Sequence, residues 1–338
     1  MEDRYEWPYN RVMDATALIH TPVKLLTIYI VVFKTPQEFR FNSFFTLDVL
    51  VWNFMGNVLF SFVHLYPTFP SSCFRLDGPL SWVLDNETFG HVMFVLIFVT
   101  IINVGTALVI NFPYRYLALR SITSQTNPWT TFKLCAGLHL ATSSFLVVSI
   151  CFWCVSYTNY PDQTQLPPRE LLFCFYPTGW RKLLPVLGFY AFIGLAAAIV
   201  LLFAVLLFIQ LYFKTTISST KTLALQRSLL WKLVAQTFVI LVFGGIPMLI
   251  AVFTMLFPEK YYAQPICLVC ITLLLNHGTV YSIVTLVMMK SYRDALWRMV
   301  FGKKTTSTST VIQMKSRPWP VLQRSQTTRS LYLKNVTS

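Results

Sequence analysis

The sequence contains little charge. Asp, Glu, Lys and Arg make up only 12% of the 338 residues and hydrophobic residues make up 55%, whereas an ordinary soluble domain carries about 25% charged residues. Apolar runs of about 20 residues recur along the chain, and this length crosses the hydrocarbon core of a bilayer as a helix. Because a helix satisfies its own backbone hydrogen bonds, the composition excludes an ordinary soluble domain and predicts a helical membrane protein.

Sequence signatures of catalysis are also absent. The chain has no glycine-rich phosphate loop, no Gly-x-Ser-x-Gly and no His/Glu pair at the spacing of metal ligands. Two Cys-x-x-Cys pairs, at 151/154 and 267/270, fall inside apolar segments without further ligands, so we interpret them as small interior residues rather than a zinc site. We therefore expect no enzyme activity, no metal and no cofactor.

The start of the chain lacks the pattern of a cleavable signal peptide. Such a signal opens with a basic region followed directly by a short apolar one, but residues 1–6 are acidic and polar. We expect the first apolar segment to act as its own signal-anchor.

Seven segments are long and apolar enough to be transmembrane helices. We place them at 13–33, 41–65, 90–112, 132–155, 184–213, 229–256 and 265–289. The expected fold class is an all-α membrane protein, a seven-transmembrane helix bundle with a short amphipathic eighth helix. Its parts would be an extracellular N-terminus, the transmembrane domain, an amphipathic juxtamembrane helix and a disordered cytoplasmic tail, at 1–12, 13–289, 290–302 and 303–338.

The distribution of charge predicts the orientation. With the C-terminus inside, most Lys and Arg residues fall in cytoplasmic loops and the tail, while most acidic residues fall outside. The positive-inside rule then places the N-terminus outside. We interpret the net charge of +14 as contact with anionic membrane lipids and cytoplasmic partners rather than with nucleic acid. The sequon at Asn86 falls in the first outer loop, where glycosylation is expected, and the one at Asn335 would stay unmodified in the tail.

Two cysteines lie in the predicted outer loops, Cys73 in the first and Cys174 in the second. Because these loops would face an oxidising compartment, this is the pair that we expect to form a disulfide. Two free thiols are the alternative. The second loop, about 156–183, is rich in proline and aromatic residues, and either it folds over the mouth of a pocket or its prolines alone shape it.

Polar residues inside the spans are candidate switch residues. Asp48 lies well inside the second span, and since a charge in lipid is costly, it should face the bundle interior and find a partner, for which Asn276 is a candidate. This pattern predicts a polar switch network, or else a simple interhelical hydrogen bond or a protonated acid. Arg115-Tyr116 ends the third span, where Arg115 either reaches back to the interface or holds neighbouring helices together until activation.

The sixth and seventh spans carry further candidates. Pro247 follows two glycines, which predicts a kink that serves as a pivot or as a static bend. His277 and Gly278 place polar and small groups against neighbouring helices. Beyond the membrane edge, Tyr292 and Arg293 lie on the two faces of an amphipathic helix on the inner leaflet.

Three of these stretches resemble a known family, the nematode seven-helix chemoreceptors of serpentine receptor class H. Residues 21–36 resemble its first helix with the Phe-Lys-Thr-Pro exit, Arg115-Tyr116 matches the end of its third helix, and residues 277–293 resemble its last helix and exit. The likeness extends to about residue 300. Two features depart from the family: no acid shortly precedes Arg115, and Ser291 stands where the exit usually has proline.

The resemblance implies a G-protein-coupled chemosensory receptor at the plasma membrane of chemosensory neurons, in the sensory cilium. It would detect an unknown small molecule or peptide, entering from outside between helices three, five, six and seven, and activate a heterotrimeric G protein. The alternative is a seven-helix ligand-gated channel or transporter, although inverted repeats and a row of acidic pore residues are missing. The coupling and switch residues expected on the receptor interpretation are Arg115, Tyr116, Pro247, Asp48, Asn276, His277, Tyr292 and Arg293.

Overall fold

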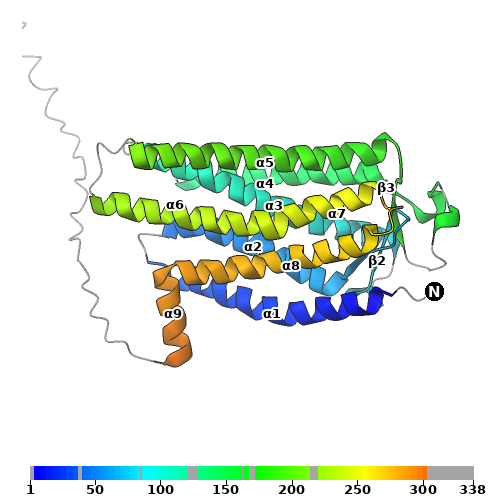
Figure 1. The fold of residues 1–338 in the computed structure, drawn as a ribbon, viewed down its shortest axis with the longest axis horizontal. Coiled ribbons are helices and arrows are strands. Elements are labelled where there is room, and N and C mark those ends of the chain that lie inside the picture. The colour runs from blue at the N-terminus through cyan, green and yellow to red at the C-terminus, as the bar shows by residue number, and fades with distance from the viewer. Residues whose placement is uncertain are drawn as a thin grey trace, which may run out of the picture. The chain divides into compact units, whose positions relative to one another are not determined.

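The computed structural model describes residues 4–36, 40–83, 86–120, 128–161, 163–166, 172–213 and 220–302. Within these residues, seven helices are long and apolar enough to cross a membrane, which confirms the predicted seven-transmembrane bundle (Figure 1). The predicted tail at 303–338, with Asn335, lies outside the described residues.

The spans follow the predicted order. They are α1 (Glu6–Phe33), α2 (Arg40–Val63), α3 (Glu87–Arg120), α4 (Pro128–Trp153), α5 (Trp180–Phe213), a composite sixth span, and α8 (Ala263–Met288). The sixth span consists of α6 (Thr220–Ile240), a π-helical turn η5 (Leu241–Gly245) and α7 (Ile246–Leu256). Helix α9 (Lys290–Phe301) follows at the position predicted for the amphipathic helix.

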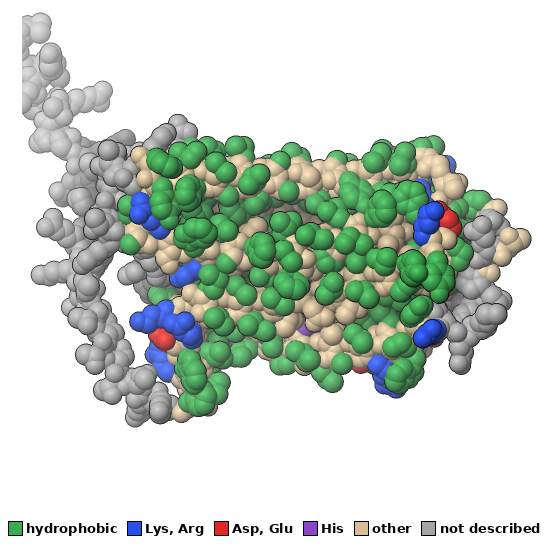
Figure 2. Space-filling model, viewed as in Figure 1, with side chains coloured by type: hydrophobic (Ala, Val, Ile, Leu, Met, Phe, Trp, Pro, Cys, Tyr) green, Lys and Arg blue, Asp and Glu red, His purple; other side chains and the backbone are tan. Residues whose placement is uncertain are grey.

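Helices α3 and α8 form the centre of the bundle. Helix α3 packs against α2, α4 and α5, and α8 packs against α1, α2, α6 and α7. Helix α5 instead lies at the edge of the bundle, with few fully buried residues and many exposed ones, whereas most of the apolar stretch of α3 is buried. Its outward side chains are apolar, and Figure 2 shows hydrophobic side chains over the middle of the bundle and charged ones at its ends. This exterior suits a lipid surround.

The loops that the sequence predicts to lie outside, which we call the outer loops, form a small antiparallel sheet, and the sequence did not predict this sheet. Its strands are β1 (Leu65–Pro67), β2 (Cys73–Leu76), β4 (Phe173–Phe175) and β3 (Cys154–Val155), in this spatial order. Aromatic residues favour strands because they pack against cross-strand neighbours, and Phe74 of β2 lies opposite Phe173 of β4. Both rings are buried against α3, so the second outer loop covers the end of the bundle instead of lying free over it.

Helix α1 begins at Glu6, earlier than the span predicted from residue 13. Tyr9 and Met13 are buried, and the Tyr9 hydroxyl donates to the backbone oxygen of Leu65 at 2.8 Å. The first two turns of α1 therefore pack against the outer sheet, a tertiary contact that hydropathy alone does not reveal.

Candidate functional site

A polar cluster joins α1, α2 and α8 in the middle of the bundle. Lys24 Nζ donates to Asn53 Oδ1 at 2.5 Å and to the Asn53 backbone oxygen at 3.2 Å. Asn53 Nδ2 lies 2.7 Å from His277 Nε2, and His277 Nδ1 bonds the backbone oxygen of Leu274. All three side chains are buried. Since a polar group buried without a partner is costly, these bonds hold the three helices in one arrangement.

Gly278 makes this cluster possible. A Cβ at this position would lie 2.5 Å from Lys24 Nζ and still closer to Asn53 Oδ1. Real Cβ atoms essentially never come within 3.0 Å of another heavy atom. The close approach of α8 to α1 and α2 therefore requires glycine, in agreement with the close packing that the sequence predicted here.

The π-helical turn η5 lies against the same cluster. A Cβ on Gly244 would lie 3.2 Å from the His277 ring, so the turn and the imidazole are in close contact. The backbone N–H of Ile246 donates to the Leu241 oxygen, one residue further than in an α-helix. Pro247 follows within the first turn of α7 and has no N–H to donate. At the position of the predicted kink, the sixth span therefore contains a widened turn, a feature often found at functional positions.

A second polar network joins α2, α3 and α4 through His139. Asn103 Nδ2 donates to Val99 O and Ser143 Oγ, both at 2.8 Å, which directs Asn103 Oδ1 toward His139 Nδ1 at 2.5 Å. His139 Nε2 lies 3.1 Å from Asp48 Oδ2, so the His139 ring of α4 bridges Asn103 of α3 and Asp48 of α2.

The predicted pairing of Asp48 with Asn276 is therefore wrong. Asn276 Nδ2 donates to the Thr272 oxygen one turn earlier in α8, at 2.9 Å, while Asp48 contacts His139 on α4. The sequence placed both polar residues within spans, but it could not show which face of each helix they occupy. The partner of Asp48 is instead His139, a residue that was not among the candidates.

Arg115 and Tyr116, at the end of α3, make different contacts. Arg115 Nε donates to Asn111 Oδ1 at 2.8 Å, and within the described residues no carboxylate pairs with it, in keeping with the missing acid before it. Tyr116 packs against Phe203 of α5, with ring centroids 5.7 Å apart. This end of α3 contacts α5 and α6 through a cluster that includes Phe112 and Leu207.

Tyr292, in the first turn of α9, ties that helix to α1 and α2. Its hydroxyl lies 3.0 Å from both Thr35 Oγ1 and Ser43 Oγ, and the residue is 1% exposed. Arg293 remains exposed, with Nη1 3.3 Å from the Val287 oxygen. The adjacent predicted residues thus have different roles: Tyr292 is a buried contact between three helices, whereas Arg293 faces outward.

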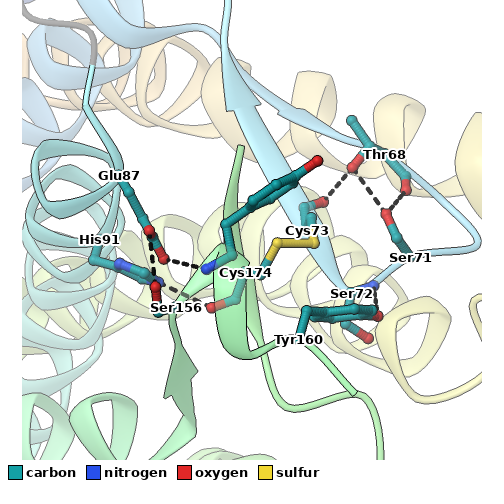
Figure 3. The surroundings of a disulfide bond; sticks show 10 residues. Thr68, Ser71, Ser72, Cys73, Glu87, His91, Ser156, Tyr160 and Cys174 are labelled. Atoms are coloured by element: carbon teal, nitrogen blue, oxygen red, sulfur yellow. Dashed lines mark hydrogen bonds between the residues drawn. A yellow bond between two sulfur atoms is a disulfide. The ribbon is translucent and has the colours of Figure 1, made fainter. Parts of the chain in front are cut away.

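A disulfide joins the two outer loops. Cys73 and Cys174 are bonded across β2 and β4 (Figure 3). His91 Nε2 of α3 lies 2.9 Å from the Cys174 backbone oxygen, and Glu87 accepts the Tyr157 N–H at 2.8 Å. The bonded loops are therefore also fixed to the outer end of α3.

The end of the bundle that bears the outer loops carries a partly buried charge cluster. Arg75 bonds Asp77, and its Nη2 lies 3.0 Å from Glu6 Oε1. Burial acts to lower the pKa of Arg75, but hydrogen bonds and charges from Asp77 and Glu6 outweigh it and raise that pKa. Asn86, the predicted glycosylation site, is exposed next to this end, and its Oδ1 accepts the Phe89 N–H at 2.7 Å as the cap of α3.

A cavity of about 470 Å³ lies between α2, α3, α5, α6, η5 and α8. Its size falls within the roughly 300–1,000 Å³ of sites for small ligands. Asn53 and His277 of the first polar cluster line one wall, and Gly244 of η5 lines it beside them. An occupant of the cavity would therefore contact both the polar cluster and the π-helical turn.

Sequence reasoning missed several residues of these networks. Lys24, Asn53, Asn103 and His139 were not assigned to a network from the sequence. Each is a polar residue within an otherwise apolar helix, which is a signal of interior position and function. The sequence shows that several polar residues lie within α2, α3 and α8, but it does not show which of them pair.

Comparison with known proteins places these features in context. Residues 7–302 match a family model described as "Serpentine type 7TM GPCR chemoreceptor Srh". The matched segment includes all seven spans and α9. Comparison with curated proteins gives no match.

Proposed function

Because the chain belongs to the serpentine seven-transmembrane chemoreceptor family Srh, we propose that it detects a ligand at the cell surface and activates a heterotrimeric G protein. The N-terminus lies outside and the C-terminus inside, and the protein resides at the plasma membrane of a chemosensory neuron, in its sensory cilium. The charge distribution of the loops supports this orientation.

One observation carries the proposal, the contact between the cavity and the π-helical turn η5 of the sixth span. Gly244 and His277 both line the cavity, and they lie against one another. A ligand that binds one arrangement of η5 better than another shifts the balance between the two, because only differential affinity moves a conformational equilibrium. Motion of α6 relative to α8 would also change the Gln236 Nε2 to Thr285 Oγ1 bond, which is 2.8 Å.

The inner ends of the helices are the proposed G-protein surface. Arg115 and Tyr116 at the end of α3 adjoin α5 and α6, and Tyr292 fixes the start of α9. Outward movement of α6 would open this end, as expected for a receptor that admits part of a G protein. Arg115 bonds only Asn111 of its own helix among the described side chains, so no ionic restraint ties this end of α3 to a neighbouring helix, and this favours a measurable basal activity.

The experiment that tests this function measures nucleotide exchange. Membranes from cells that express the receptor are mixed with purified heterotrimers of each Gα class, and GTP uptake is compared with membranes from untransfected cells. We expect one class to respond without added ligand, and Arg115→Ala to lower this response at equal surface expression. Silence of every class, or an ionic current in the absence of any G-protein response, would contradict the receptor function and favour a channel.

Orientation is tested separately. An N-terminal tag should be stained on intact cells and a C-terminal tag only after permeabilisation. Asn86→Gln should remove a glycan and increase electrophoretic mobility, and Asn335→Gln is the matched control that should change nothing. A C-terminal tag accessible from outside would reverse the topology.

A further inference from the structure

The cavity wall has few free polar groups that could bind a polar ligand. Most residues that line it are apolar, and none is acidic, Lys or Arg. Its amides are already bonded within the protein: Asn53 with Lys24 and His277, and Asn57 Nδ2 with the Leu275 oxygen at 2.9 Å. A peptide or an ion would lose its hydrogen bonds to water without replacement, and that loss is costly.

One hydroxyl in the wall is different. Thr237 of α6 lines the cavity, and its Oγ1 is buried with no hydrogen-bond partner among the described residues. Native proteins rarely leave such groups unpaired. If the Thr237 side chain turned its hydroxyl toward the cavity, a single hydroxyl or carbonyl group on an otherwise apolar occupant would satisfy it.

The outer end of the cavity is closed by aromatic rings. Phe189 lines the cavity and packs on Phe98, which stacks on Phe94, which in turn contacts Phe175 of β4; the ring centroids are 6.1, 4.5 and 4.6 Å apart. All four rings are buried, and the disulfide-linked sheet lies above them. The access route from outside that the sequence suggested is therefore blocked by a packed layer.

The wall between α5 and α6 is thin. Leu201 of α5 and Phe238 of α6 line the cavity and are 66% and 62% exposed on the bundle. Ala197 lies one turn before Leu201, also lines the cavity and is exposed. Small residues at 194 and 196–198 of α5 leave space that α6 does not fill.

The two helices are tied together above and below this thin wall. On the outer side, Tyr190 OH of α5 donates to the Leu249 oxygen of α7 at 2.9 Å. On the inner side, Arg227 Nη2 of α6 donates to the Leu211 oxygen at 2.9 Å, beside a cluster in which Leu207 packs on Leu230. Between these two hydrogen-bonded contacts, apolar side chains of α5 and α6 form the surface. The two helices contact one another and can be followed in Figure 1.

We propose that the cavity binds a lipophilic small molecule with one hydrogen-bonding group, such as a medium-chain alcohol, ketone or ester, which enters from the bilayer between α5 and α6. This proposal rests on the receptor function above and names the ligand class and its route. The apolar body of the ligand fills the space between α3 and α5, and its polar group bonds Thr237. The occupant then presses on η5, where Gly244 and Gly245 line the cavity.

The test uses the full-length receptor in phospholipid nanodiscs and a decanol analogue with a photoreactive diazirine and an alkyne tag. After illumination, labelled peptides are mapped by mass spectrometry. We expect labelling of cavity residues on α5 and on α6 to η5, and competition by excess unmodified decanol. Labelling that does not saturate, or that falls only on residues facing lipid, would overturn the proposal.

Three variants identify the route and the site. Ala197→Phe obstructs the opening, and we expect it to lower the rate of labelling about tenfold, which corresponds to about 1.4 kcal/mol. Ala198→Phe is the matched control, since Ala198 is exposed but does not line the cavity, and it should label as the wild type does. Gly105→Leu fills the space from the α3 wall, where a Cβ would meet only Phe192 at 3.5 Å, and should lower the final extent of labelling. Equal labelling of all three would overturn the proposal.

The occupant must also be distinguished from a bilayer lipid. A phospholipid with the same diazirine on its acyl chain is the second probe. Labelling of the cavity by the alcohol but not by the phospholipid supports a free ligand, and the reverse overturns it. Because this assay needs no G protein, a receptor that binds the alcohol without coupling would contradict the proposed function alone, and one that couples without binding it would contradict this inference alone.

Discussion

Gly278→Ala tests whether the polar cluster of α1, α2 and α8 sets the stability of the bundle. The added methyl would lie 2.5 Å from Lys24 Nζ and overlap Asn53 Oδ1. Neither neighbour can move freely, because the Asn53 side chain bonds both Lys24 and His277. The helices must separate, or Asn53 must turn away and break its bonds.

The expected cost follows from these two effects. Overpacking of a filled interior costs about 1–3 kcal/mol, and loss of a hydrogen bond to a charged group costs about 1.5–3 kcal/mol. If both effects apply, the total is about 2.5–6 kcal/mol, and we expect a fall in melting temperature on the order of 10 °C. The assay heats the detergent-solubilised, fluorescently tagged receptor and measures the remaining monodisperse peak by size-exclusion chromatography.

Gly137→Ala is the matched control. A Cβ at Gly137 in α4 meets nothing within 4 Å, and replacing a helix-interior glycine by alanine favours the helix by about 0.5–1 kcal/mol. This variant should be as stable as the wild type or slightly more so. In an Asn53→Ala background, Gly278→Ala should cost less than in the wild type, since the overlapping oxygen is gone. Equal melting temperatures of Gly278→Ala and Gly137→Ala would refute the reasoning.

Three further perturbations test the other contacts. Tyr292→Phe removes the hydroxyl shared by α1, α2 and α9, and the free energy of unfolding should fall by about 1 kcal/mol, measured by the same heating assay. Cys73→Ser with Cys174→Ser opens a loop of 101 residues, and chain entropy predicts a loss of about 4.7 kcal/mol for such a loop, seen as a lower melting temperature under non-reducing conditions. Asp48→Asn and His139→Phe should each destabilise, and their double mutant should be less harmful than the two effects together, with a coupling of about 0.5–3 kcal/mol.

The substitutions at Tyr292 and at the disulfide each have a matched control variant, and the Asp48–His139 pair is controlled by additivity. Tyr29→Phe alters an exposed tyrosine and should leave the melting temperature unchanged, so an equal loss there would deprive Tyr292 of its special role. Cys151→Ser removes an exposed free thiol and should have no effect comparable with opening the disulfide. Strict additivity of the Asp48 and His139 effects would show that the two residues do not act as a pair.

The class of the fold could be predicted from the sequence, because a bilayer requires every transmembrane helix to be about 20 residues long and predominantly apolar. Residues 13–33 already signalled the first helix, and the Srh match confirms the resemblance noted in three short stretches. The prediction was least precise where tertiary contacts decide the structure. The contact of Tyr9 with Leu65 accompanies the longer α1, and a hydropathy profile does not include contacts between residues far apart in the sequence.

The candidate site could be predicted only in part, for a related reason. Interior polar residues were recognisable, yet their partners depend on the rotation of each helix about its axis, which a span of 20 apolar residues hardly constrains. Asp48 therefore received the wrong partner. The outer sheet was missed because its strands are only two to four residues long, too short for an alternating pattern to emerge.

The outer sheet also imposes an order on biosynthesis. Cys174 follows Cys73 by 101 residues, and α3 and α4 lie between them, so the ribosome finishes two more spans before the disulfide can close. At roughly 5–20 residues per second, this interval lasts on the order of 5–20 s. If these loops face outside as proposed, the nascent receptor exposes the Cys73 thiol and one unpaired edge of β2 to the folding machinery of the secretory pathway throughout this interval. The disulfide can therefore close once the first four helices have been made and while the last three are still being synthesised.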